Sequence, residues 1–302
     1  MGARRYLRLT PETVWGTYDD EATPLIIDLD TANSYTVRPK PITVDVRTAG
    51  GRNRRHRKIS KKTSLTGNFN MLLAGSHAAA IKTWICAAPT TDAIGSMTVD
   101  YVIQMDNSSH TKVYSRDLGM KVMQCGINSS EQAQLVRLAL QLVGKQRAVI
   151  DVDDFAEPAA ADYPDDAYFT HQDLSGAFSI SSSRTEFETL NVTIKNMFDV
   201  KFFESEFPTR IDFCGRDVDW TSKLAYKIAT DRSNMESVTP VTAGATWNNG
   251  VNTFALAFQG KNHYDNVEDD LDDSKVWLQE LSMQSFWDYA AGTPNDFAIT
   301  TT

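Results

Sequence analysis

Residues 135–143 read LVRLALQLV, and this stretch decides the fold class. The even-numbered positions from Val136 to Leu142 are apolar and face one way, whereas Arg137 and Gln141 face the other way. A period of two with one apolar face is typical of a half-buried antiparallel strand. The stretch therefore predicts a sheet that has a core face and a polar face.

The same period recurs along the chain, for example in residues 97–105, where every second position is apolar. Residues 276–283 fit either a strand or a helix. A clear helix is indicated where Ile81, Trp84 and Ile85 follow the helical period, with Ser76 as a candidate cap and Pro89 as a stop. Further strands are predicted at residues 5–9, 42–46, 65–73, 111–115, 120–125, 174–180, 187–194, 210–214 and 253–259.

These patterns predict a mainly β protein with a flanking helix, built as a β-sandwich or barrel. Three echoes suggest that this unit is used twice. Residues 65–71 (LTGNFNM) resemble residues 174–180 (LSGAFSI), residues 119–122 resemble 215–218, and residues 138–145 resemble 254–261. The spacing between the echoes differs in the two copies, so a duplication requires loops of different length.

The length of 302 residues suits two domains of about 150 residues each. An acidic segment with Ala and Pro, residues 151–166, lies near the middle, and we expect domains at residues 1–155 and 156–302. No apolar run approaches the roughly 20 residues that span a bilayer. The three cysteines are far apart and show neither metal-ligand nor disulfide spacing. We therefore expect a soluble protein, made in a reducing cytoplasm, that has no membrane partner.

The net charge of −9 is unevenly distributed. Blocks of like charge repel each other, so each block is expected in a solvated loop. The basic block is Arg52, Arg54, Arg55, Arg57, Lys58, Lys61 and Lys62, and the acidic candidates that could bind it or face a lumen are Asp151, Asp153, Asp154, Asp265, Glu268, Asp269 and Asp270.

The basic block has two interpretations. Several arginines and lysines together could bind nucleic-acid phosphates by releasing counterions. Alternatively, they belong to a long loop that contacts an acidic neighbouring protein. The block lacks interleaved aromatic residues for base stacking, and the chain as a whole is acidic. We therefore favour contact with protein.

Motifs for catalysis are missing from the sequence. Gly50 and Gly51 lack the helix and the Lys-Ser/Thr of a phosphate loop, and the five histidines are isolated. No Gly-x-Ser-x-Gly elbow supports a catalytic triad. The abundant carboxylates are expected to be solvated. We therefore expect no enzyme activity, no catalytic residues, no metal site and no cofactor.

The order of elements resembles that of the major tail tube proteins of long-tailed, non-contractile phages. The resemblance begins with RYLRL (residues 5–9) and ETVWGT (residues 12–17), which are similar to that family's first strand and E-x-x-x-G-T turn. It continues over most of the chain, and no single motif is diagnostic. The other matching stretches are residues 50–52, 65–69, 81–88, 119–122, 135–144, 194–196 and 215–218.

The resemblance implies a structural virion protein that assembles into stacked rings. In that family, two sheets and a helix form each tube domain, and inner sheets of neighbouring domains join into one barrel around a channel. A long loop between early strands reaches adjacent subunits. Double-stranded DNA is expected to pass through the channel without specific binding during ejection. Other tail proteins would bind the tube ends, and assembly would take place in the host cytoplasm.

Two domains per chain would let three chains form a ring with pseudo-sixfold symmetry, which we favour over six chains. The basic block is then expected in the loop between subunits or rings. The polar face of the strand quoted first, with Arg137, Gln141 and Lys145, is a candidate channel lining. Negative charge repels DNA phosphates, so a net negative protein suits a channel.

Two alternatives from other classes stay open. A head–tail connector or another virion protein could bind nucleic acid directly through residues 52–62. A carbohydrate-binding or hydrolytic β-sandwich would need a cleft with paired acids and exposed aromatic residues.

Overall fold

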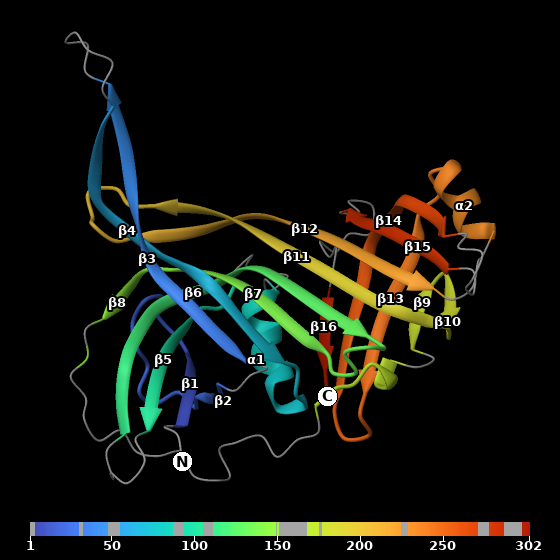
Figure 1. The fold of residues 1–302 in the computed structure, drawn as a ribbon, viewed down its shortest axis with the longest axis horizontal. Coiled ribbons are helices and arrows are strands. Elements are labelled where there is room, and N and C mark those ends of the chain that lie inside the picture. The colour runs from blue at the N-terminus through green and yellow to red at the C-terminus, as the bar shows by residue number, and fades with distance from the viewer. Residues whose placement is uncertain are drawn as a thin grey trace.

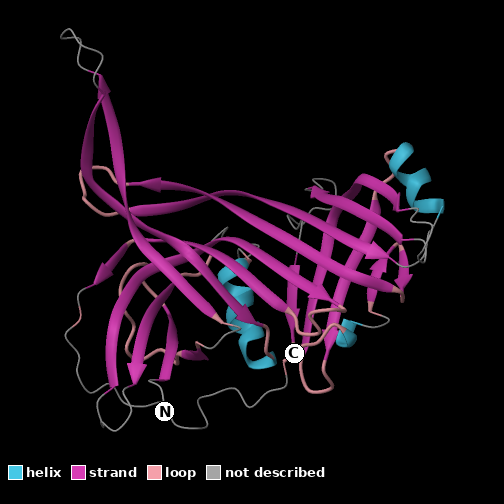
Figure 2. Cartoon of the chain, in the orientation of Figure 1, coloured by secondary structure: helices cyan, strands magenta, loops and turns pink. Residues whose placement is uncertain are grey.

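The computed structural model describes residues 4–29, 33–47, 55–86, 94–104, 111–148, 150, 168–174, 177–224, 229–270, 278–286 and 298–302. For some of these, including residues 42–47, 55–61, 269 and 270, only the backbone is described. Most of the described chain is strand, and the fold is mainly β as the sequence pattern predicted (Figure 2).

The first half of the chain contains the elements up to residue 148, and the second half contains the rest. The first half comprises β1 Arg4–Pro11, β2 Leu25–Asp28, β3 Ser34–Arg47, β4 Arg55–Leu72, α1 Gly75–Ile85, β5 Met97–Gln104, β6 Thr111–Ser130, β7 Arg137–Gly144 and β8 Gln146–Ala148. The second half comprises the 3-10 turn η2 Gln172–Leu174, β9 Phe178–Ile180, β10 Ser182–Arg184, β11 Phe187–Lys201, β12 Arg210–Leu224, α2 Ala229–Glu236, β13 Val241–Asn248, β14 Thr253–Asp270, β15 Leu278–Phe286 and β16 Ala298–Thr301.

One sheet, here called the central sheet, runs through both halves in the order β3-β4-β7-β6-β11-β12-β15-β14. Every neighbouring pair in it is antiparallel. Two flanking sheets branch from it, because the first part of β6 pairs with β5 and β8, and the first part of β14 pairs with β13 and β16. Figure 1 shows the β3–β4 hairpin projecting from the body as an arm.

The pairing scheme of the first half is repeated in the second. β4 pairs with β3 and β7, as β12 pairs with β11 and β15. β1 pairs with β2 and β5, as β9 pairs with β10 and β13. Helix α1 follows β4, and α2 follows β12 at the corresponding place. Each strand of the first half, from β1 to β8, thus has a counterpart from β9 to β16 in the same order.

The register repeats as well. Val37 lies opposite Gly67, Gly67 opposite Leu142, and Leu142 opposite Val122. The counterpart row in the second half is Val192, Trp220, Met283 and Tyr264. A β-bulge follows this row in both halves, between Val122 and Gln124 and between Tyr264 and Asn266. Because bulges fix the local register, their coincidence aligns the two halves residue by residue.

The echoes seen in the sequence are not these counterparts. Residues 65–71 lie in β4, but residues 178–180 form β9, the counterpart of β1. Residues 138–144 lie in β7, whereas 254–261 lie in β14, the counterpart of β6. Likewise, residues 119–122 lie in β6 but residues 215–218 in β12. The three alignments are therefore wrong, because alternating apolar residues with a glycine occur in many unrelated strands.

The apolar core is continuous between the halves, and α1 lies at the place where they meet. Ile81, Trp84 and Ile85 are buried, as the helical period predicted. The helix is preceded by Ala74 rather than capped by Ser76, and it ends at Ile85. Pro89, the predicted stop, lies outside the described residues. Leu278 to Phe286 form a strand, which settles the ambiguity of residues 276–283 within the described part.

Candidate assembly interface

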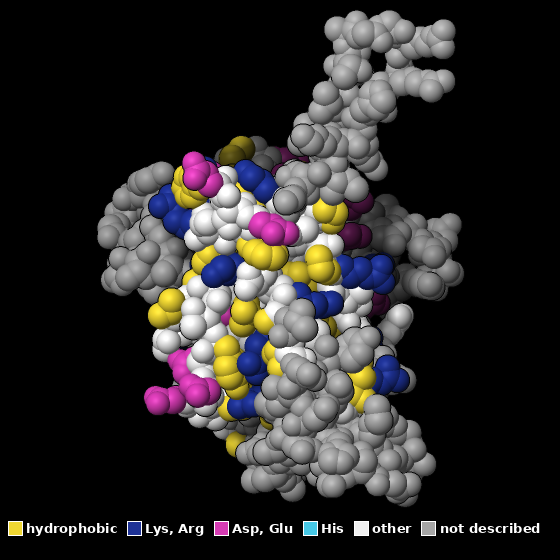
Figure 3. Space-filling view, turned by 90° about the vertical axis from the view of Figure 1, so that its left-hand side faces the viewer, with side chains coloured by type: hydrophobic (Ala, Val, Ile, Leu, Met, Phe, Trp, Pro, Cys, Tyr) yellow, Lys and Arg dark blue, Asp and Glu magenta, His cyan; other side chains and the backbone are white. Residues whose placement is uncertain are grey.

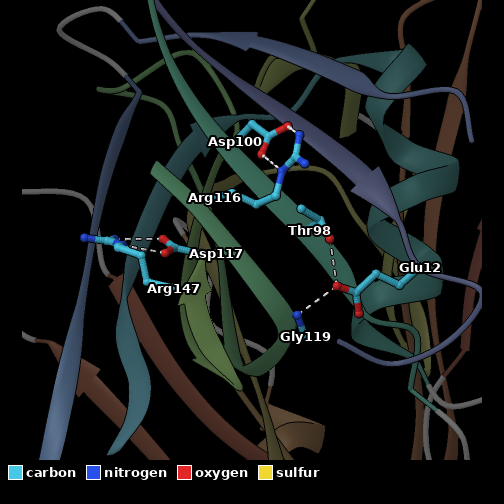
Figure 4. A network of polar contacts seen from close by, with 7 residues as sticks. All are labelled: Glu12, Thr98, Asp100, Arg116, Asp117, Gly119 and Arg147. Carbon is cyan, nitrogen blue, oxygen red and sulfur yellow. Dashed lines mark hydrogen bonds and ion pairs between the residues drawn. The ribbon is translucent and has the colours of Figure 1, made fainter. Parts of the chain in front are cut away.

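A hydrogen-bond network around Glu12 holds the first half together (Figure 4). Its carboxylate accepts hydrogen bonds from the backbone N–H groups of Gly16 and Gly119, each at 2.8 Å. It also accepts hydrogen bonds from the hydroxyl groups of Ser96 and Thr98, each at 2.8 Å. The bond to Gly16 closes the ETVWGT turn, so this network explains why the turn carries an acidic residue and a glycine four positions apart.

Gly119 is the point at which β6 passes from the flanking sheet to the central sheet. Met120 still pairs with Met97 of β5, whereas Lys121 pairs with Val143 of β7. The φ angle of Gly119 is +68°, a conformation that glycine adopts readily. Trp15 donates its indole N–H to the Gly119 carbonyl at 3.0 Å. The network thus fixes the bend that lets one strand serve two sheets.

Two further ion pairs lie within the first flanking sheet, between β5 and β6 and between β6 and β8 (Figure 4). The carboxylate of Asp100 is buried and pairs with Arg116 at 2.6 Å. The carboxylate of Asp117 is also buried and pairs with Arg147 at 2.6 Å. Arg147 additionally donates to the carbonyl of Val37 in β3 at 3.0 Å. These contacts position β3 at the edge of the central sheet.

The two halves meet through an antiparallel ladder between β6 and β11, here called the internal junction. It runs from the pair of Gln124 with Lys195 to the pair of Ser130 with Thr189. Buried Asn196 reinforces it by donating its side-chain N–H groups to the carbonyls of Ile85 at 3.1 Å and of Val122 at 3.0 Å. The central sheet is therefore continuous in hydrogen bonding from one half to the other.

The β11–β12 hairpin tip also reaches the base of the β3–β4 arm. Thr63 donates its backbone N–H to the carbonyl of Glu206 at 2.9 Å. Lys62 donates its ammonium group to the carbonyl of Phe203 at 3.0 Å and lies 5.8 Å from the centroid of the Phe202 ring. A hairpin of one half thus rests on a hairpin of the other.

Both edges of the central sheet lack a strand partner among the described residues. At one edge, β3 pairs only with β4. Thr63 of β4 points its backbone N–H away from β3. In an antiparallel pair the opposite residue, Pro41 of β3, then points its ring nitrogen away from β4 and toward the open edge. Pro39, two positions away on β3, points its ring nitrogen the same way. Prolines are tolerated on sheet edges because they have no N–H to donate. This alternating pair of prolines is a sequence signal that could have identified the edge strand.

At the other edge, the last part of β14 pairs with β15 on one side only. Its exposed side chains include Asp265, Asn266 and Glu268. The edge strands are antiparallel to each other, because eight antiparallel strands in a row reverse direction seven times. The two open edges are therefore complementary in direction.

A comparison with protein families identifies the family of the chain. The sequence model of the family described as phage tail tube protein matches residues 2–285. The chain belongs to the phage tail tube family. Its role is accordingly structural, as a component of the virion tail that assembles with itself into a tube and contacts other tail proteins. A comparison with curated proteins finds no match.

From Arg55 onward, the basic block of this tail tube protein lies in strand β4 and not in the expected solvated loop. Arg52 and Arg54 are outside the described residues, and only the backbone of β4 is described at Arg55, Arg57, Lys58 and Lys61. Lys62 is the described member, and it binds a backbone carbonyl and faces an aromatic ring of the same chain. Elsewhere on the described surface around the arm, Lys and Arg side chains are interspersed with hydrophobic ones (Figure 3).

The acidic residues and the channel-lining residues predicted from the sequence lie on different strands, and some lie outside the described residues. Asp265 and Glu268 are exposed on β14, and the backbone of Asp269 and Asp270 continues that strand. Asp151, Asp153 and Asp154 lie outside the described residues. Arg137 and Gln141 are exposed on the polar face of β7, as predicted. Lys145 follows β7, and its ammonium group lies 5.3 Å from the centroid of the Trp15 ring, away from that polar face.

The polar face of the central sheet carries mostly uncharged side chains near its middle. One row across it consists of Thr36, Asn68, Gln141, Gln124 and Lys195. Asn128 and Asn191 make side-chain contact across the internal junction on the same face. Within the described residues, no group of His, Cys, Asp and Glu is placed to hold a metal ion. None of the described helices is long and apolar enough to cross a membrane.

Proposed function

We propose that the chain is a double tube domain, with domains at residues 1–155 and 156–302, and that three chains close one ring of a phage tail tube. The supporting observation is the repeated four-strand order of the central sheet, joined at its middle by the internal junction. A unit that already joins its own copy within the chain has the geometry to join the next copy in a ring.

Ring closure would bring β14 of one chain beside β3 of the next. The edges run antiparallel, so the alternating direction of the central sheet would continue without interruption. Closure would cover both open edges, which would otherwise invite uncontrolled pairing. At Pro39 and Pro41, β3 would contribute carbonyl acceptors but no N–H donors, so this ladder would have fewer hydrogen bonds than the internal junction. The interface joins two different surfaces and is therefore heterologous, as closed rings require. Three copies of two similar halves would give pseudo-sixfold symmetry.

The polar face of the central sheet would line the channel, because the flanking sheets cover its other face. Asn68, Gln124 and Gln141 would present neutral amides to passing DNA, with Arg137 on the same wall. Neutral side chains and a net charge of −9 would avoid strong retention of phosphates. We propose that double-stranded DNA passes through this channel during ejection, without a specific binding site.

The β3–β4 arm, with the basic block of residues 52–62, would contact a neighbouring subunit or ring. Within the chain, the tip of the β11–β12 hairpin already rests on the base of this arm. Contact between the basic block and a neighbour's acidic residues on β14 or in residues 151–154 is part of the proposal. Rings would stack into the tube in the host cytoplasm, and other tail proteins would close the tube ends.

Electron microscopy of concentrated purified protein tests the tube, and native mass spectrometry of rings tests their stoichiometry. Tubes or stacked rings with three chains per ring are expected. Rings of six chains would contradict the trimer, and a protein that forms no rings or tubes but retains DNA in a salt-sensitive way would favour the connector alternative.

A further inference from the structure

The proposed ring needs a contact between two chains that closes it, and the inference about this contact rests on that proposed ring. The two halves align residue by residue through the matched rows and bulges described above. The junction of β6 with β11 is therefore a template for the contact of β14 with β3 of the next chain.

The template gives a register for that contact. Within the chain, Gly126 lies opposite Thr193. Tyr264 is the counterpart of Val122. Gly126 is four positions after Val122 and Glu268 is four positions after Tyr264, so Glu268 is the counterpart of Gly126. Val37 is the counterpart of Val192, so Arg38, which follows Val37, is the counterpart of Thr193, which follows Val192. Transferring the junction thus places Arg38 directly opposite Glu268.

We propose that Arg38 of one chain forms an ion pair with Glu268 of the neighbouring chain and that this pair selects the closing edges. The next residues on the same face would place Lys40 opposite Asn266, because Gln124 lies opposite Lys195 in the template. Arg38, Lys40 and Glu268 are all exposed in the single chain. The partner is therefore a second copy of this chain in a defined register.

Charge supports this register. Glu268 lies directly opposite Glu280 of β15, and like charges at such a position are unfavourable. Lys223 lies on the far side of Glu280, so it is not the direct neighbour of Glu268. An arginine on the open side of Glu268 would offset the repulsion. The corresponding pair at the internal junction, Gly126 and Thr193, is uncharged.

This difference separates the two contacts by function. The internal junction is tethered within one chain and needs no charge to select its partner. The closing contact must find the correct edge on another molecule, and complementary charge favours that partner over wrong ones. Two β3 edges or two β14 edges would bring like charges together.

Charge reversal tests the pair. Arg38→Glu and Glu268→Arg should each lower the yield of rings and tubes by about tenfold or more, and the double variant should restore it. Arg137→Glu is the matched control, because Arg137 is an exposed arginine on the same sheet face, within the central sheet and away from its edges. Equal loss in the control, or no recovery in the double variant, would overturn the pair.

Cross-linking tests the register without relying on charge. In a Cys214→Ser background, which removes the exposed native thiol, Arg38→Cys with Glu268→Cys should form disulfides between chains on oxidation. Covalent species should end at the trimer, and each single cysteine variant should stay uncross-linked at this contact. If wild-type protein forms tubes but the pair does not cross-link, the register is wrong and the tube function stands. If wild-type protein forms neither rings nor tubes, the proposed function itself fails.

Discussion

The carboxylate of Glu12 accepts a hydrogen bond from the backbone N–H of Gly119, although the two residues are 107 positions apart in the chain. This contact fixes the turn after β1 to the bend at which β6 changes sheets. The end of β6 then forms the internal junction with β11. The turn at the start of the chain thus supports the geometry through which the two halves join.

Glu12→Ala should destabilise the fold by about 3 kcal/mol, because it removes a charged acceptor from two backbone N–H groups and two hydroxyl groups. Chemical denaturation of the unassembled chain would measure the loss. Glu21→Ala is the control, since Glu21 is exposed in the loop after the turn, and it should change stability by less than about 0.5 kcal/mol. Similar effects of the two substitutions would argue against the network.

Asn196→Ala should destabilise the chain by about 2–3 kcal/mol, because it leaves buried carbonyls of Ile85 and Val122 without their donor. Unfolding should remain a single transition, since one continuous core spans the two halves. Calorimetry would report both quantities. Asn191→Ala at the same junction removes an amide on the exposed face and should cost less than about 0.5 kcal/mol. Two separate transitions in the wild type would contradict a shared core.

Local patterns in the sequence predicted the strand content and the polar face of β7, because alternation is a property of neighbouring residues. They did not reveal α2, whose sequence ATDRSNME has no apolar stripe. The pairing of strands could not be predicted from the sequence either. Apart from the bond to Gly16, the Glu12 network joins residues 84 to 107 positions apart, and the echoes matched strands that occupy different places in the sheets. Pairing is decided by packing between distant segments, which a repeat of seven residues cannot specify.

Alkaline pH should destabilise the chain through a partly buried tyrosine, Tyr35, and a buried one, Tyr264. Burial, followed by the nearby carboxylate of Asp117, raises the pKa of Tyr35 well above 10.0. Burial, followed by the hydrogen bond to Asp231, likewise raises the pKa of Tyr264. Well below pH 10 both phenols are protonated in the folded and unfolded states. Above it the unfolded state releases protons that the folded state retains, so stability falls as the pH rises.

Measured unfolding free energies at about pH 8 and about pH 11 should therefore differ, and the difference should shrink in Tyr264→Phe. This variant also loses the hydrogen bond to Asp231, so only the change with pH reports the titration. Tyr168→Phe, at an exposed tyrosine, is the control and should keep the full loss. An unchanged alkaline loss in Tyr264→Phe would exclude Tyr264 as a source.

Gly67 tests whether the β3 edge is needed for assembly. A Cβ at this position would lie 2.0 Å from the carbonyl oxygen of Thr36 and 2.5 Å from the Cα of Val37, both in the backbone of β3. Gly67→Ala should therefore push β3 away from β4 and destabilise the fold by about 3 kcal/mol or more. Protein that still folds should form few rings, because its closing edge is displaced.

Gly126→Ala is the matched control in the same sheet. The nearest atoms to its Cβ would be 3.7 Å away, an ordinary contact, so stability should change by less than about 1 kcal/mol and rings should form. Denaturation curves and electron microscopy of both variants would separate folding from assembly. Normal rings from Gly67→Ala would show that β3 can shift without loss of the closing contact. The strand that closes the ring would then not be β3.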